Sequence, residues 1–150
     1  MAEKEPLLIS GCMLGLCCRF DGECKPIGKD LLNALREKFA LIPVCPEQLG
    51  GLATPREPSE FDGTRFLSRA GEDVTAQFQK GAEEAHRIAR FFGCKRALLK
   101  EKSPSCGFGK IYDGSFTKTL VGGNGATAEL LSKNGIAIYG ETRINELLGE

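Results

Sequence analysis

Short apolar segments alternate with longer segments of helical periodicity along most of the chain. The apolar segments, which we predict to be strands, are 7–9, 40–44, 97–99 and 136–139. The segments with helical periodicity are 30–39, 75–92, 125–133 and 142–148. Continuous apolar runs are typical of strands that are buried on both faces, and strands that alternate with helices favour a parallel sheet. The pattern therefore predicts an α/β fold with a mostly parallel sheet flanked by helices.

Several single residues refine this prediction. Asp30 and Thr75 are good N-cap residues for the first two helices. Pro43 lies inside a predicted strand, which indicates an edge strand or a distortion, since proline cannot donate to a sheet. The segment 46–73 is rich in glycine and proline, with a possible short strand at 64–68. A loop of that length in a small domain is usually functional.

Composition narrows the class of protein. The 150 residues suit one domain, so we expect 1–150 to form a single compact domain. Twenty basic residues balance twenty acidic ones, which argues against a polyelectrolyte nucleic-acid binder. No apolar run approaches the roughly 20 residues of a membrane helix, and the charged first residues lack a signal-peptide core. We therefore expect a cytoplasmic protein that does not bind a membrane.

Seven cysteines are many for a protein in a reducing compartment, and an odd number does not suggest a disulfide framework. Cys12, Cys45 and Cys106 each follow a predicted strand, so they can converge at the carboxyl edge of the sheet. Thiolates suit zinc, copper(I) or iron–sulfur clusters, and three thiolates leave one metal position free. Two other interpretations stay open: buried packing cysteines, or a zinc site, for which His86 is the sole histidine.

Long motifs around these cysteines resemble the thiouracil desulfidase family. The motifs are residues 10–15 with 18–22, 45–52 with 55–56, and 100–107 with 111–116, supported by 71–75 and 78–82. They cover nearly the whole chain. Gly11 and Phe20 differ from the residues that are usual in the family, and neither is a ligand position.

The resemblance implies a compact Rossmann-like domain with an oxygen-sensitive [4Fe-4S] cluster on Cys12, Cys45 and Cys106. It implies an enzyme that removes sulfur from a thiolated pyrimidine, such as 2- or 4-thiouracil or its nucleotide, by hydrolysis without net redox chemistry. Hydrogen sulfide is the expected second product. The catalytic carboxylate of the family falls on Glu47, and its catalytic serine falls on Ser103.

Several alternatives remain at this point. Cys17, Cys18 or Cys24 would close the cluster if one of them were a fourth ligand. Related enzyme functions are an open-iron hydratase or dehydratase and a desulfidase acting on thiolated tRNA. A cluster without turnover would instead serve a redox or iron sensor. Arg56 and Lys102 either bind a phosphate or carboxylate, or are simply solvated.

Overall fold

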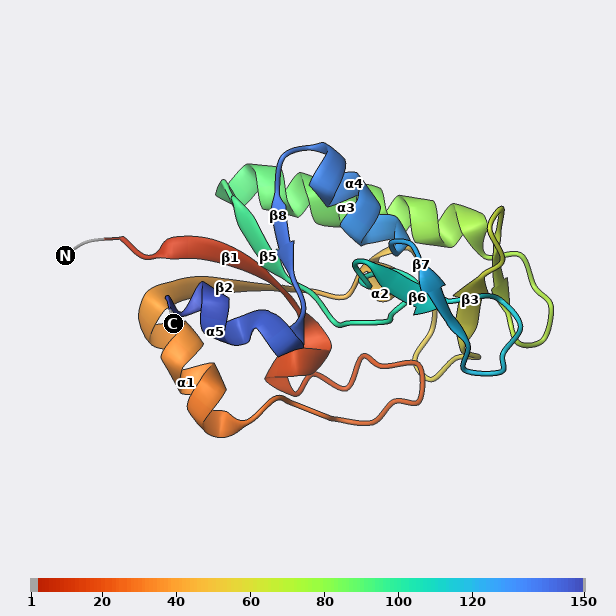
Figure 1. Cartoon of the computed structure of the whole chain (residues 1–150), viewed down its shortest axis with the longest axis horizontal. Coiled ribbons are helices and arrows are strands. Elements are labelled where there is room, and N and C mark those ends of the chain that lie inside the picture. The colour runs from red at the N-terminus through yellow and green to blue at the C-terminus, as the bar shows by residue number, and fades with distance from the viewer. Residues whose placement is uncertain (1–2, 150) are drawn as a thin grey trace.

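Four parallel strands form the centre of the computed structural model, which describes residues 3–149. They are β1 (Glu5–Ser10), β2 (Phe39–Val44), β5 (Arg96–Leu98) and β8 (Ala137–Tyr139). Their order in the sheet is β2-β1-β5-β8, and every neighbouring pair is parallel (Figure 1). The predicted parallel sheet is confirmed, with each strand within a few residues of its expected position.

Helices cover both faces of this sheet. In Figure 1, α3 (Thr75–Phe92) and α4 (Ala126–Lys133) lie on one face, and α1 (Lys29–Lys38) and α5 (Ile144–Leu147) lie on the other. Alternation along β1 divides the core, since Leu8 packs in the cluster of α3 and α4 whereas Leu7 and Ile9 pack in that of α1 and α5. The predicted α/β fold with flanking helices is therefore confirmed. Within residues 3–149, none of the helices has the length and apolar character needed to cross a membrane.

Both edges of the sheet have distinctive strands. The edge strand β2 contains Pro43, which pairs in register with Ile9 of β1. The prediction that Pro43 marks an edge is therefore confirmed. The opposite edge strand, β8, has only three residues.

Smaller elements gather beyond the carboxyl ends of the strands. A 3₁₀ helix, η1 (Gly11–Leu14), follows β1, and the short helix α2 (Pro46–Leu49) follows β2. Two antiparallel hairpins complete this end: β3 (Ser59–Phe61) with β4 (Phe66–Ser68), and β6 (Lys110–Tyr112) with β7 (Leu120–Gly122). Strand β4 confirms the short strand expected at 64–68. The other three hairpin strands were not predicted.

Two helix caps and one helix differ from the predictions. Helix α1 begins at Lys29 with Gly28 as its N-cap, so Asp30 lies in the first turn, where a negative charge favours the helix dipole. Thr75 is the first residue of α3 and not its cap, because its hydroxyl accepts a hydrogen bond from the Phe66 amide of β4 at 2.9 Å. The last predicted helix is split into a 3₁₀ turn, η2 (Glu141–Arg143), and α5.

Candidate functional site

Three neighbouring strands bring the predicted cysteines to one cavity. Cys45 follows β2, Cys12 lies in η1 after β1, and Cys106 lies in the loop after β5. All three are free thiols, and they line a cavity of about 500 Å³. Glu47 and Ser103 line the same cavity. The fold therefore assembles all five predicted site residues at the carboxyl edge of the sheet, as open parallel sheets do for their ligands.

Close packing of α2 on α3 fixes the position of Glu47. A Cβ atom on Gly50 would overlap the backbone carbonyl of Gln77, and one on Gly81 would overlap that of Pro46. Only glycine at these two positions lets the two backbones come so close. Because Cys45 immediately precedes α2, the same contact fixes both Cys45 and Glu47 at the cavity.

The loop between β5 and β6, residues 99–109, is held against the start of α4 and is called the Cys106 loop below. The backbone amides of Gly125, Ala126 and Thr127 donate to carbonyls of this loop at 2.7–3.0 Å. The Ser105 and Thr127 hydroxyls also share a buried hydrogen bond of 2.7 Å. These contacts satisfy the free amides of the first helical turn and hold Cys106 in place.

Ser103 stabilises the turn that carries Cys106. Its hydroxyl oxygen accepts hydrogen bonds from the backbone amides of Ser105 at 3.1 Å and Cys106 at 3.0 Å. A serine hydroxyl has two lone pairs and one proton. Both lone pairs are engaged, so the proton of Ser103 is the group left to donate into the cavity that the residue lines.

Glu47 is paired with a nearly buried arginine. Arg56 Nε donates to Glu47 Oε1 at 2.9 Å, and the two side chains are only 9% and 16% exposed, respectively. Arg56 is therefore not solvated, and that part of the sequence interpretation is wrong. Arg56 also lines the cavity, and anion binding by this residue stays a prediction. Lys102 lines the cavity, as an anion-binding role would require. Sequence reasoning missed the pairing because nothing in the spacing of residues 47 and 56 indicates it.

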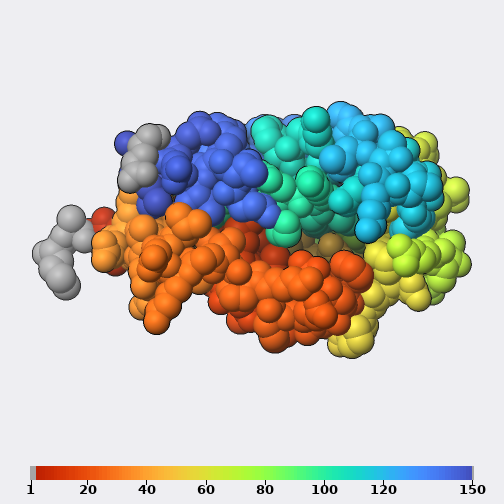
Figure 2. Space-filling model, turned by 60° about the horizontal axis from the view of Figure 1, so that its bottom comes forward, coloured from red at the N-terminus to blue at the C-terminus, as the bar shows by residue number. Residues whose placement is uncertain are grey.

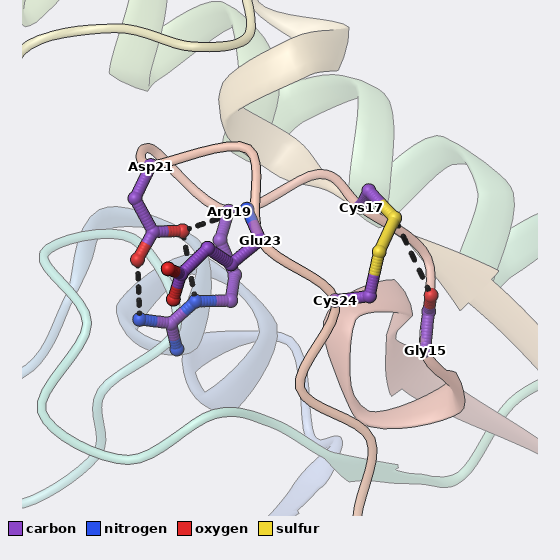
Figure 3. The surroundings of a disulfide bond; sticks show 6 residues. All are labelled: Gly15, Cys17, Arg19, Asp21, Glu23 and Cys24. Carbon is purple, nitrogen blue, oxygen red and sulfur yellow. Dashed lines mark hydrogen bonds and ion pairs between the residues drawn. A yellow bond between two sulfur atoms is a disulfide. The ribbon is translucent and has the colours of Figure 1, made fainter.

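The remaining cysteines separate into three groups. Cys17 and Cys24 form a disulfide at the surface (Figure 3), so the expectation of unpaired cysteines is wrong there, and this bond removes both from the candidate fourth ligands. Cys94 packs in the core beneath α3. Cys18 is buried and lines the cavity, and its carbonyl accepts a hydrogen bond from Cys45 Sγ at 3.6 Å. Cys18 thus stays a candidate for a fourth ligand.

The donor set fits a cluster better than a single ion. Across residues 3–149, no three His, Cys, Asp or Glu side chains lie close enough to share one metal ion. The three thiols instead line a cavity, and in a [4Fe-4S] cluster each cysteine binds a different iron. His86 lies half-buried on α3, away from the residues that line this cavity. A polynuclear cluster matches this arrangement, and a zinc site does not.

Burial raises the pKa of three free thiols, those of Cys12, Cys18 and Cys106, and keeps them protonated. It raises the pKa of Cys106 to about 12, against a weaker opposing effect of the Ser10 hydroxyl. Burial also raises the pKa of Cys12, and Lys100 partly offsets this. The pKa of Cys18 rises to about 12 through burial and the neighbouring Cys45. Thiolates at these positions therefore require a cation to replace their protons, as in a metal site.

Comparisons with known proteins agree with this geometry. A family model described as 2-thiouracil desulfurase matches residues 7–143. The uncharacterized protein YbbK of Bacillus subtilis (strain 168) is 36% identical over 152 residues, covering 95% of this chain and 99% of the relative. The solved structure of the [4Fe-4S]-dependent thiouracil desulfidase TudS has a TM-score of 0.91 and 43% identity, covering 96% of this chain and 95% of that one. The resemblance found in the motifs is confirmed, and the chain belongs to the 2-thiouracil desulfurase family.

Proposed function

We propose that this protein is a [4Fe-4S]-dependent thiouracil desulfidase, formed by residues 1–150 as one domain. The observation that carries the proposal is the convergence of three free cysteines, Glu47 and Ser103 on one cavity. The similarity to TudS, whose name states this activity and cofactor, supports it. The reaction exchanges the thiocarbonyl sulfur for oxygen: the thiopyrimidine and water give the oxo pyrimidine and hydrogen sulfide.

Cys12, Cys45 and Cys106 would hold the cluster. With three protein ligands, a four-iron cluster supplies one iron as a thiophilic Lewis acid for the substrate sulfur. The role of the chain is to keep the three thiolates apart and the cavity shaped around them. The Cys106 loop does so through its bonds to α4, and Cys45 does so through the contact of α2 with α3.

Glu47 is the proposed general base. It would take a proton from the water that attacks the ring carbon, for which its free oxygen must lie within hydrogen-bond reach of that water. The carboxylate lines the cavity, and one of its oxygens is already bonded to Arg56. The other oxygen is therefore the one that would face the water.

Ser103 is the proposed proton donor. Because its two lone pairs are taken by backbone amides, its hydroxyl orientation is fixed as a donor. Such a group would stabilise negative charge on a ring nitrogen or on the developing oxyanion. A donor that is fixed before the substrate binds needs no reorganisation during the reaction.

The cavity wall bears on the choice of substrate. Arg69, Lys102 and Lys118 line the same cavity as the cysteines. These cationic side chains would complement a phosphate group. We therefore propose a thiopyrimidine nucleotide as a better substrate than the free base, while a thiolated tRNA is disfavoured by the neutral net charge.

The many thiols also bear on location. The free thiols of the site persist best in a reducing compartment, although the surface Cys17–Cys24 disulfide is unusual there. We therefore propose a cytoplasmic location, which cell fractionation would test.

The deciding experiment is anaerobic reconstitution with iron and sulfide, followed by a sulfide-release assay on 2-thiouracil, 4-thiouracil and 4-thiouridine monophosphate. We expect about four iron atoms per chain and sulfide release in step with formation of the oxo product. A fully loaded cluster without sulfide release would refute the enzyme proposal and favour the sensor alternative. The Glu47→Ala variant should lose turnover but keep the visible cluster absorption. Normal turnover in this variant would refute the assignment of the base.

A further inference from the structure

We propose that Arg56 is a positioning residue, which holds the Glu47 carboxylate by one oxygen at the cavity. The inference rests on the proposed function, because it takes Glu47 as the general base. Three groups carry it through their hydrogen bonds: the Arg56 guanidinium, the Glu47 carboxylate and the Cys18 carbonyl.

The guanidinium is almost fully used by the protein. An arginine has five N–H donors. Arg56 Nε donates to Glu47, Nη1 donates to the Ala53 carbonyl at 3.1 Å and to the Thr54 hydroxyl at 2.9 Å, and Nη2 donates to the Cys18 carbonyl at 3.0 Å. Four of its five donors are therefore committed, and its side chain is 9% exposed. A residue that binds substrate would keep its donors free, so this geometry indicates a positioning role.

The carboxylate of Glu47 is bound at one oxygen only. Its Oε1 accepts from Arg56, and among residues 3–149 no other donor contacts the carboxylate. The guanidinium is itself held by three further hydrogen bonds, so this one bond fixes the position of Oε1. Arg56 thus orients the group and leaves Oε2 available for water in the cavity that Glu47 lines.

A single carbonyl connects the guanidinium to the segment that carries Cys18. The Cys18 carbonyl accepts from Arg56 Nη2 at 3.0 Å. The Arg56 backbone amide also donates to the Phe20 carbonyl at 2.7 Å. Arg56 therefore joins three segments around the cavity: α2, residues 18–20 and residues 53–56. Without it, the Glu47 carboxylate would lose its connection to the other two segments.

The experiment compares Arg56→Gln and Arg56→Lys with the wild-type holoenzyme after anaerobic reconstitution. We expect kcat to fall by about 10²-fold, the size of effect produced by misplacing a reacting group, with a much smaller change in KM. Lysine keeps the positive charge but not the planar set of N–H donors. The kcat of Arg56→Lys should therefore fall nearly as much as that of Arg56→Gln. Iron content and cluster absorption should stay at the wild-type level. In an Arg56→Ala variant, added guanidinium should restore part of kcat, which a purely structural role would not allow.

The matched control is Arg96→Lys. Arg96 also pairs with a glutamate, Glu5, through two bonds of 2.9 Å, at the opposite end of the sheet from the cavity. Its loss should leave kcat unchanged. A raised KM with unchanged kcat in the Arg56 variants would overturn the proposal in favour of substrate binding. Reduced iron content would also overturn it, in favour of a role in holding the cysteine loops.

A crystal structure of the Arg56→Gln variant tests the positioning role independently of the desulfidase activity. If the loaded wild type releases no sulfide, the desulfidase proposal fails, but the structure still tests the position of Glu47. We expect the Glu47 carboxylate to move away from the place that it occupies beside Arg56. A carboxylate that keeps its place in the variant would overturn the positioning role whatever the turnover.

Discussion

Two loops line the cavity, and they are held in different ways. The Cys106 loop is anchored by backbone hydrogen bonds to α4, and its Ser105 and Cys106 are 1% and 5% exposed. The Cys18 loop, residues 15–24, is attached mainly through Arg56, whose guanidinium and backbone amide donate to it, and the Cys17–Cys24 disulfide cross-links it internally. In Figure 2 the Cys18 loop lies in the orange segment, opposite the teal one, with red atoms of the N-terminal segment set back between them.

The difference indicates which of the two loops depends on individual side chains for its position. Backbone hydrogen bonds persist when a side chain is replaced. The Cys106 loop should therefore be disturbed only by steric changes or by replacement of its cluster ligand, Cys106. The Cys18 loop has exposed residues such as Leu16 and Phe20, at 50% and 40% exposure, and few backbone contacts to the rest of the fold. Loss of one side chain should therefore displace the Cys18 loop, but with smaller consequences for the cluster.

The first prediction has the largest expected effect. It tests whether the two buried thiols, one on each loop, have different roles. Cys106→Ala should lose the cluster, lowering iron from about four atoms per chain to almost none. Cys18→Ala should keep the cluster, since the proposed ligand set does not include it. Iron analysis and visible absorption after anaerobic reconstitution measure both. Loss of iron in Cys18→Ala would make Cys18 the fourth ligand and close the open iron.

The second prediction concerns the backbone hydrogen bonds that anchor the Cys106 loop to α4. In Gly125→Ala, the new Cβ would overlap the Ser105 carbonyl group. We expect the free energy of unfolding to fall by about 3 kcal/mol, as for overpacking of a tight contact, together with poorer cluster uptake. Urea unfolding measures the first effect. Gly122→Ala is the control, because nothing lies within 4 Å of its new Cβ. Equal stability of the two variants would show that the anchor is not rigid.

The third prediction concerns the cross-link of the Cys18 loop. Cys24→Ser removes a disulfide between residues seven positions apart. Loop-entropy arguments give a loss of about 2 kcal/mol of unfolding free energy. Iron content should be unchanged, unlike that of Cys106→Ala. The double variant Cys17→Ser with Cys24→Ser should be no less stable than the single one, since both lack the same bond. A further loss in the double variant would contradict the pairing.

The smallest effect is electrostatic. Arg19 beside Asp21 lowers the pKa of that carboxyl from 3.8 to about 2, helped by the Glu23 amide (Figure 3). Because the folded-state pKa is the lower one, this stabilisation is present above pH 3.8 and is lost as the pH falls toward 2. Solvent screening keeps it below about 1 kcal/mol. Asp21→Asn should therefore be slightly less stable than wild type at pH 6 and equal to it near pH 2 in urea unfolding.

Arg19→Gln is the companion variant. It should reproduce the stability difference of Asp21→Asn and its disappearance in acid, because both changes break the same pair. A difference that persists unchanged in acid would rule out the Asp21 carboxyl as its source.

The sheet and the three cysteines were predictable because both follow from short-range patterns and one rule of topology. Apolar runs mark the buried strands, and in parallel sheets the loops after neighbouring strands meet at one edge. For the hairpin of β6 and β7, in contrast, the one local signal is Asp113-Gly114, a dipeptide typical of hairpin turns, because its three-residue strands are too short to show a pattern. The hairpin is held in part by the buried Glu60, whose carboxylate accepts from the Gly114 and Phe116 amides at 2.9 and 3.1 Å. That contact spans more than fifty residues of sequence.

The environment of Glu47 was unpredictable for the same reason. The motif resemblance assigned a role to the residue, but its partner depends on the path of an irregular segment between residues 50 and 58. The disulfide likewise depends on how the Cys18 loop folds back on itself. Site residues that directly follow strands can be recognised in the sequence. Side-chain partners that are brought together by irregular loops cannot.

The outer strand β2 has a consequence for self-association. A proline there removes an amide that a neighbouring chain would need in order to extend the sheet, and β8 at the far side is too short to offer much of a template. Growth by strand addition, the common route to fibrils and sheet-fused dimers, is therefore blunted on both sides. A second copy would have to approach this central sheet through the helices and loops around it.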